Sequence, residues 1–267
     1  MRWMKKMDKK TKGESKMERL KIEHGWWNEI QPEGLPYPTS TLISGPGGTG
    51  KPLIGLAFVK EWLKAGGDVI FIPLQYPDMT FVKKTIKELY GIDLKEWDES
   101  VTYIRFDHEI QDHEKIGENI WKTNLLKPEV WEDIIEKAEE FMTEGNDLNT
   151  LVFSSALNLL LFSPTYREGV LDELERLLQR SKKRSYLFNV STSAFGDEIK
   201  GLEDSADNLM FTRMGDDMDL YLKIERMENE EASSDEVRVP IKKEMLEEIK
   251  EVAKGVKKRH IPELKKI

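Results

Sequence analysis

One short segment limits the folds available to this chain more than any other. Residues 45–51 read Gly-Pro-Gly-Gly-Thr-Gly-Lys, in which four residues separate the first glycine from a Gly-Lys pair. The preceding residues 39–44 are apolar and β-branched and predict a buried strand, and residues 53–64 have helical spacing. A glycine-rich turn between a strand and a helix lets backbone N–H groups face inward toward an anion. The segment therefore predicts a phosphate-binding P-loop in which Lys51 reaches the terminal phosphates.

The residue after the loop lysine departs from the usual P-loop pattern. A Ser or Thr in this place supplies a hydroxyl ligand to magnesium, whereas this chain has Pro52. Proline also lacks an N–H group, but it is tolerated in a first helical turn. We expect the fold to survive and the metal ligand to be absent. The predicted phosphate site, without a metal site, consists of Gly45, Pro46, Gly47, Gly48, Thr49, Gly50, Lys51 and Pro52.

The remaining pattern predicts an α/β fold. Expected strands at 68–74, 101–106, 150–154 and 185–190 alternate with expected helices at 79–90, 128–142 and 167–180. Asp78 is a plausible N-cap of the first of these helices, which ends at Gly91. Two late strands, 209–212 and 220–224, predict an antiparallel pair, and residues 241–256 an amphipathic helix. Such alternation predicts a mostly parallel central sheet with helices on both faces.

Charge is distributed unevenly along the chain. The net charge is −9, with +6 on residues 1–21 and +5 on residues 254–267, which leaves −20 on the body. An acidic body is a poor partner for nucleic acid, although the basic ends could bind it. We predict a disordered basic tail at 1–18, one domain at 19–240, and a C-terminal amphipathic helix with a basic tail at 241–267.

Composition excludes several classes of protein. The chain has no cysteine, which rules out disulfides, thiolate metal sites and a cysteine nucleophile. It has no apolar run long enough for a membrane span and no secretory signal pattern, so we expect a cytoplasmic protein. Charged residues make up 34% of the chain, a content common in proteins of hyperthermophiles.

From about residue 20 to 240 the chain resembles the RecA superfamily and, within it, the archaeal KaiC-like ATPases. The resemblance rests on residues 34–51 (GLPYPTSTLISGPGGTGK), on the spacing to the strand at 68–74, and on residues 205–211 (SADNLMF). The resemblance implies a RecA-like P-loop fold, ATP as a ligand, and assembly into rings or filaments with nucleotide at subunit borders.

Three further family positions are changed in this chain. Relatives carry a pair of glutamates at the end of the second strand, one of which polarises the attacking water, where this chain has Gln75 and Tyr76. Relatives end the Walker B strand in an aspartate, where this chain has Ser154. A Lys-Met-Arg motif that reaches the neighbouring subunit's nucleotide is replaced by Arg-Met-Glu at 226–228.

These changes converge on one chemical step. Magnesium and the general base carry most of the positioning and charge neutralisation in phosphoryl transfer, and both lose their protein support here. We therefore predict a pseudo-ATPase without catalytic residues, which holds a nucleotide, a peptide or a protein partner in the cleft at the strand ends. We expect residues 45–51, Gln75, Tyr76 and Ser154 to line this cleft. ATP, if it binds at all, should bind with weak or no dependence on magnesium. The alternative is an ATP-binding subunit of an assembly in signalling or DNA recombination, in which a partner supplies the missing groups. A homo-oligomer is compatible with either.

Other residues attract attention but have simpler interpretations. His108 and His113 are five residues apart, which is not the spacing of a zinc-binding helix, so a solvated loop is favoured. Trp26 and Trp27 predict core or interface packing. The polar run 191–193 follows the fifth strand and fits either a sensor of the terminal phosphate or strand-end capping.

Overall fold

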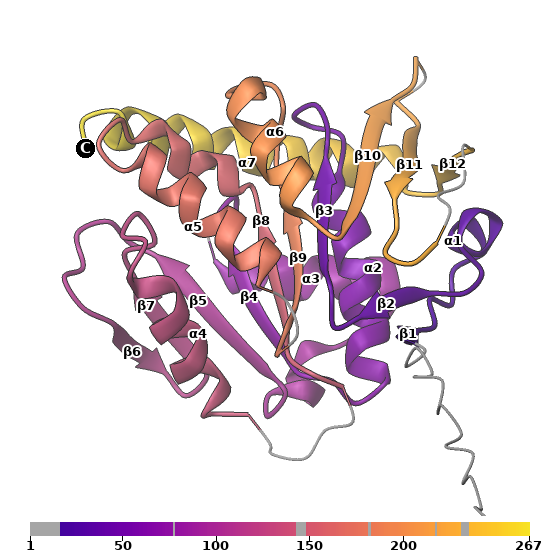
Figure 1. The fold of residues 1–267 in the computed structure, drawn as a ribbon, viewed down its shortest axis with the longest axis horizontal. Coiled ribbons are helices and arrows are strands. Elements are labelled where there is room, and N and C mark those ends of the chain that lie inside the picture. The colour runs from indigo at the N-terminus through magenta and orange to yellow at the C-terminus, as the bar shows by residue number, and fades with distance from the viewer. Residues whose placement is uncertain (1–16, 77, 143–147, 181–182, 217, 231–234) are drawn as a thin grey trace, which may run out of the picture.

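The computed structural model describes residues 17–76, 78–142, 148–180, 183–216, 218–230 and 235–267. Its centre is a ten-stranded sheet in the order β12-β11-β10-β3-β9-β8-β4-β5-β7-β6, with a separate pair β1-β2 (Figure 1). The strands are β1 (Glu18–Leu20), β2 (Leu35–Tyr37), β3 (Ser40–Ser44), β4 (Val69–Pro73), β5 (Val101–Phe106), β6 (Glu114–Gly117), β7 (Ile120–Thr123), β8 (Leu151–Ser155), β9 (Ser185–Asn189), β10 (Asn208–Met214), β11 (Leu220–Arg226) and β12 (Glu236–Val239).

Strand direction divides the sheet into a parallel centre and antiparallel edges. All pairs from β10 to β7 are parallel, whereas β10-β11, β11-β12 and β6-β7 are antiparallel. The carboxyl ends of the central strands therefore meet at one edge of the sheet, the place where open α/β folds bind ligands. The predicted mostly parallel α/β fold with a late antiparallel pair is confirmed.

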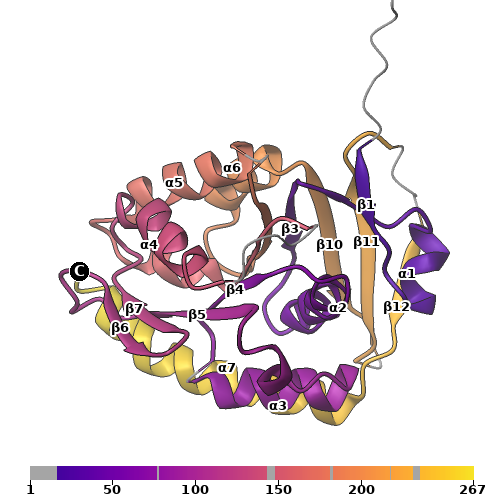
Figure 2. The same ribbon diagram turned by 90° about the horizontal axis from the view of Figure 1, so that it is seen from below.

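Helices cover both faces of the sheet (Figure 2). Helices α2 and α3 lie on one face, and α4, α5 and α6 lie on the other. The helices are α1 (Gly25–Ile30), α2 (Lys51–Lys64), α3 (Met79–Tyr90), α4 (Val130–Glu139), α5 (Arg167–Gln179), α6 (Gly196–Ser205) and α7 (Lys243–Leu264), with 3₁₀ turns η1 (Leu94–Trp97) and η2 (Leu157–Phe162).

Neighbouring strand residues enter opposite cores because side chains alternate across a sheet. Ile43 and Phe71 join the core under α2, whereas Leu42 and Ile70 join the core under α4 and α5. Both cores are continuous and apolar, so the strands are buried on both faces, as expected for a parallel sheet.

The C-terminal helix α7 crosses the carboxyl edge of the sheet, seen in yellow in Figure 1. Leu246 and Ile249 near its start pack into the α2 core, and Leu264 at its end packs into the α5 core. An ion pair between Lys84 of α3 and Glu248 of α7 (2.6 Å) ties the two helices together. The expected helix at 241–256 thus continues for eight more residues, because apolar contacts hold the basic segment that follows.

Elements with weak patterns differ from the sequence predictions. The segment 107–113, where a loop was expected, has no helix or strand. The hairpin β6-β7 that follows it was not predicted, and neither were β1, β2, α1, α6 and β12. The expected helix at 128–142 is shorter, since α4 ends at Glu139. The predicted N-terminal tail at 1–18 lies mostly outside the described residues, which start at residue 17. Its last residue, Glu18, begins β1.

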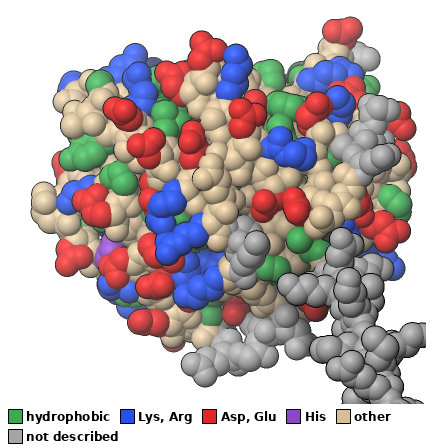
Figure 3. Space-filling view, in the orientation of Figure 1, with side chains coloured by type: hydrophobic (Ala, Val, Ile, Leu, Met, Phe, Trp, Pro, Cys, Tyr) green, Lys and Arg blue, Asp and Glu red, His purple; other side chains and the backbone are tan. Residues whose placement is uncertain are grey.

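The surface is charged and mixed in sign. Acidic and basic side chains alternate over the face shown in Figure 3 without a broad apolar patch. Among the described residues, Ile116 is the large hydrophobic side chain that stands exposed. No helix in the described part of the chain is long and apolar enough to cross a membrane.

Candidate functional site

The P-loop lies at the carboxyl edge of the sheet, between β3 and α2, as its sequence context predicted. Gly45, Gly48 and Gly50 have φ values of 141°, 80° and 75°, in the region that glycine occupies without steric cost. A Cβ at Gly45 would lie 2.4 Å from the carbonyl oxygen of Thr212, so no larger residue fits there. These glycines allow the tight turn that directs the loop toward the start of α2.

Neighbouring strands hold the loop through hydroxyl groups. Thr49 Oγ1 lies 2.8 Å from Thr212 Oγ1 on β10. The N–H group of Gly47 donates to Ser193 Oγ (2.8 Å), and Ser191 lines the cavity beside the loop. The run 191–193 therefore contacts the P-loop directly, which fits the proposed position for sensing a phosphate as well as strand-end capping.

Lys51 is folded back onto the loop. Its Nζ donates to the carbonyl oxygens of Gly45 (2.8 Å) and Pro46 (2.6 Å) and to Thr49 Oγ1 (3.2 Å). Burial, with a smaller contribution from the positive charge of Lys257, lowers the pKa of Lys51 to about 7. Among the described residues, no carboxylate pairs with this ammonium group. Lys51 is thus a buried cation whose present partners are neutral oxygens, a state that an anionic ligand would relieve.

The residues present do not fit the magnesium ion that this loop type normally binds. Magnesium prefers oxygen ligands, and Pro52, in the first turn of α2, offers none from its side chain. Ser154 is fully buried, and its hydroxyl donates to the carbonyl oxygen of Ile72 (3.0 Å). The described residues include no group of three or more His, Cys, Asp or Glu side chains arranged to hold a metal. Both family positions that support the ion are therefore unable to do so.

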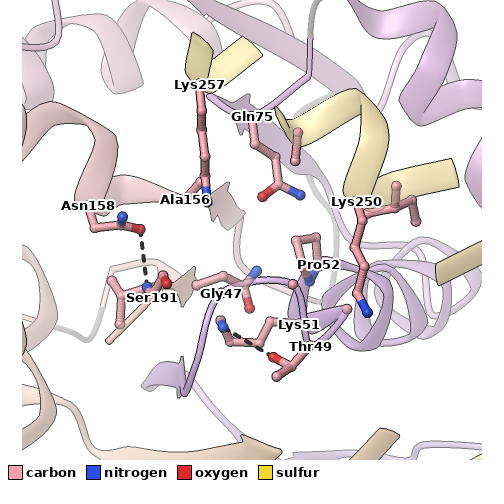
Figure 4. Close-up of a pocket in the computed structure, with 16 residues that line it drawn as sticks. Gly47, Thr49, Lys51, Pro52, Gln75, Ala156, Asn158, Ser191, Lys250 and Lys257 are labelled. Carbon is pink, nitrogen blue, oxygen red and sulfur yellow. Dashed lines mark hydrogen bonds between the residues drawn. The ribbon is translucent and has the colours of Figure 1, made fainter. Parts of the chain in front are cut away.

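The two residues at the end of β4 point to different places. Gln75 lines the cavity beside the P-loop, where its amide can orient a water molecule but cannot act as a general base (Figure 4). Tyr76 lines a second cavity of about 140 Å³, and its ring lies 4.9 Å from that of Phe81. Asp78, a carboxylate three residues after Gln75, is engaged as the N-cap of α3, where it accepts hydrogen bonds from Thr80 N (2.8 Å) and Phe81 N (3.3 Å). Of these side chains, only Gln75 is brought to the loop.

Sequence reasoning missed the wall that α7 provides. Ile249, Lys250, Ala253 and Lys257 line the cavity opposite the P-loop (Figure 4). The apolar stripe of this helix was identified from the sequence, but such a pattern does not determine which surface of the protein the helix packs against. The available signal was the pair of lysines seven residues apart, which repeats every two turns on one helix face.

Two asparagines complete the wall, Asn158 from η2 and Asn189 from the end of β9. Asn158 Oδ1 accepts a hydrogen bond from Ser191 N (3.1 Å). Asn189 is 1% exposed, and its Oδ1 has no hydrogen-bond partner in the described part of the protein. Ala156, at the mouth of the same cavity, has φ 59°, a conformation that costs energy for a residue with a Cβ. A buried acceptor and a strained backbone at one cavity are typical of a ligand site.

The enclosed space is small. The cavity has a volume of about 50 Å³, against the ~300–1,000 Å³ of typical small-molecule sites. A Cβ at Gly50 would lie 2.6 Å from Leu246 Cδ2, so α7 sits directly on the loop. With α7 in this place, the cavity admits a phosphate-sized group rather than a whole nucleotide.

Other polar residues serve structure. His113 lies between Thr123 Oγ1 (2.7 Å) and Asp133 Oδ2 (2.8 Å), so it joins the β6-β7 hairpin to α4 and is not part of a solvated loop. Arg226 donates to the carbonyl oxygens of Glu203 and Ala206 within its own chain. Both tryptophans at 26–27 are buried in the α2 core, as predicted.

Comparison with known proteins agrees with this architecture. The family model described as "ATPase: KaiC" matches residues 5–247. The KaiC-like protein PH0186 of the hyperthermophilic archaeon Pyrococcus horikoshii OT3 superimposes with a TM-score of 0.63 at 14% identity, over 85% of this chain and 96% of that one. The flagellar accessory protein FlaH of Methanocaldococcus jannaschii superimposes with a TM-score of 0.60 at 15% identity, over 84% and 96%. Among curated protein sequences, none matches significantly.

The family model covers most of the chain, including the P-loop and the strands around it. The two solved structures, at low identity, support the fold. The chain therefore belongs to the KaiC-like ATPase family of the RecA superfamily.

Proposed function

We propose that this chain is a pseudo-ATPase of the KaiC-like family, which holds a phosphate-bearing ligand, such as a nucleotide, on its P-loop without hydrolysing it. Pro52 is the observation that carries the proposal, because it removes the magnesium hydroxyl while leaving the loop and Lys51 in place. Ser154 supports it, since its hydroxyl is bonded to the backbone of β4. Gln75 supports it as well, because an amide cannot accept the proton of the attacking water.

These losses affect the same transition state and should combine. Loss of a general base alone typically costs about 10²–10⁴ in rate. The metal ion neutralises charge on the transferred group and aligns it for attack, and here the protein supplies no side-chain ligand for it. We therefore expect ATP turnover to be indistinguishable from background.

The test is release of phosphate from ATP and magnesium by the purified chain. The variant Lys51→Ala sets the background, and Pro52→Thr restores one metal ligand of the three missing groups. We expect the wild type and Pro52→Thr to match Lys51→Ala, because Gln75 and Ser154 remain unsuited. Turnover by the wild type that Lys51→Ala abolishes would show an active ATPase and end the proposal.

A further inference from the structure

Two lysines of α7 face the P-loop across the cavity. Lys250 runs along the loop, with its Cε 3.3 Å from the position of a Cβ at Gly48. Lys257 lines the cavity two helical turns later, and its charge contributes to the lowered pKa of Lys51. Figure 4 shows both side chains extending from α7 toward the loop. Three ammonium groups thus surround one small space.

No negative charge balances these cations in the described part of the chain. The residues that line the cavity include no aspartate or glutamate. Lys250 and Lys257 are half-buried, and neither forms an ion pair with another described residue, whereas their helix neighbour Lys254 pairs with Glu251 at 2.8 Å. Several partly buried positive charges without a counter-ion raise the electrostatic free energy of the protein, so the arrangement favours an anion bound between them.

The neutral groups of the cavity also match a phosphate group. Asn189 Oδ1 is a buried acceptor without a partner, able to accept a hydrogen bond from a protonated phosphate oxygen. Ser191 adds a hydroxyl, and the first turn of α2 adds the positive end of its dipole. A water-sized group needs roughly 10–15 Å³ of such space. The cavity of about 50 Å³ therefore holds a few such groups, the size of one phosphate.

We propose that Lys250 and Lys257 are ligand-binding residues that, with Lys51, neutralise a bound phosphate group in place of magnesium. This inference rests on the proposed non-hydrolysing function. It explains why the loop can keep Lys51 while its metal ligand is a proline: the positive charge comes from α7. The ligand is one phosphate group, either free inorganic phosphate or the terminal group of a nucleotide for which α7 moves aside.

The test is phosphate affinity without metal. The rise of the unfolding temperature with inorganic phosphate concentration, in EDTA, gives the Kd, since a ligand of the native state stabilises it by mass action. We expect Lys250→Met and Lys257→Met each to raise the Kd about tenfold or more, as expected for loss of a charge-assisted contact. Methionine keeps the length and packing of the side chain. Lys254→Met changes a side chain that is 75% exposed and does not line the cavity, so it should change the Kd less than about twofold.

Further arms separate the outcomes. Repeating the titration with ADP and ATP in EDTA tells the two sources of the phosphate group apart. If a nucleotide competes with inorganic phosphate, and if its affinity falls in the same two variants, then the bound group is the terminal phosphate of the nucleotide. Binding that depends on Lys51 but is unchanged in Lys250→Met and Lys257→Met would overturn the inference and leave the proposed function intact. Binding that requires magnesium would also overturn the inference, and the turnover assay then decides the proposed function. No binding of phosphate or nucleotide would overturn both.

Discussion

At the scale of single residues, Lys51 carries most of the chemistry that remains in the loop. It is buried among backbone oxygens, and its pKa is lowered to about 7. A charged lysine at this place is unfavourable in the folded protein without a ligand, so the same group that we propose to bind phosphate destabilises the ligand-free state. The destabilisation is complete below the folded pKa of about 7 and fades as the pH rises toward the unfolded pKa of Lys51.

This balance predicts a pH-dependent stability. The pKa of Lys51 is 10.5 in the unfolded chain and about 7 in the folded protein, so between these values the unfolded chain binds more protons. The free energy of unfolding must then rise with pH across that window, by up to about 1.4 kcal/mol per pH unit for one group. Lys51→Met lacks this contribution. We expect the variant to exceed the wild type in urea midpoint at pH 6.5 and to lose this advantage by pH 10.

Comparing the variant with the wild type cancels the contributions of all other titrating groups to the pH dependence of stability. A difference in midpoint that stays constant from pH 6.5 to 10 would show that Lys51 is already protonated across the window. Added phosphate should shrink the difference at low pH, because a bound anion stabilises the protonated form.

Which residues could be predicted depends on the range of their interactions. The P-loop and Pro52 are local, and the structure places the loop between the expected strand and helix. Gln75, Tyr76 and Ser154 were all expected to line the cleft. Gln75 lines it, but Tyr76 turns into another cavity and Ser154 is bonded to the backbone of Ile72. Consecutive residues after a strand leave it in different directions, and only the packing of Tyr76 on Phe81 decides which way.

At the scale of elements, strong periodicity was a reliable guide and weak periodicity was not. Helix α3 has the predicted bounds, since Asp78 caps it and Gly91 ends it in a left-handed conformation. Strand β6 is mostly exposed and β7 is mainly half-buried, and both are only four residues long, so no strong apolar pattern marked the hairpin. The position of α7 across the sheet edge depends on contacts between distant segments, and no local signal encodes those.

The join between α4 and β9 offers a test of element packing. Arg184, 3% exposed, donates to Glu139 (2.6 Å to each oxygen) and also to Glu132. Burial lowers the pKa of Arg184, but the hydrogen bonds to these two glutamates raise it by more, so the pKa is raised overall. Arg184→Met leaves partly buried glutamates without their partner. We expect the free energy of unfolding to fall by about 2–3 kcal/mol.

Arg180 is the matched control for this prediction. It contacts Glu132 at 3.3 Å from the same region, but its side chain is 61% exposed. Arg180→Met should therefore change the free energy of unfolding by under about 0.5 kcal/mol. Equal losses in the two variants, measured by urea unfolding, would mean that burial of Arg184 adds nothing.

At the scale of the whole molecule, charge and architecture separate binding from hydrolysis. The acidic body surrounds a cleft whose described lining contains lysines and no carboxylates. The sheet edge, the loop and α7 form a place for a phosphate group, while the groups that position magnesium and activate water are replaced. Under the proposed function, a protein of the KaiC-like family keeps its ligand-binding edge after losing the means of turnover.

Calorimetric titration of ATP into the purified chain, first with magnesium and then with EDTA, tests this account most directly. The account predicts binding that is as strong in EDTA as in magnesium, because lysines rather than the metal neutralise the phosphates. Binding that appears only with magnesium would contradict it, since some other group would then have to replace Pro52 and Ser154 as a support for the ion.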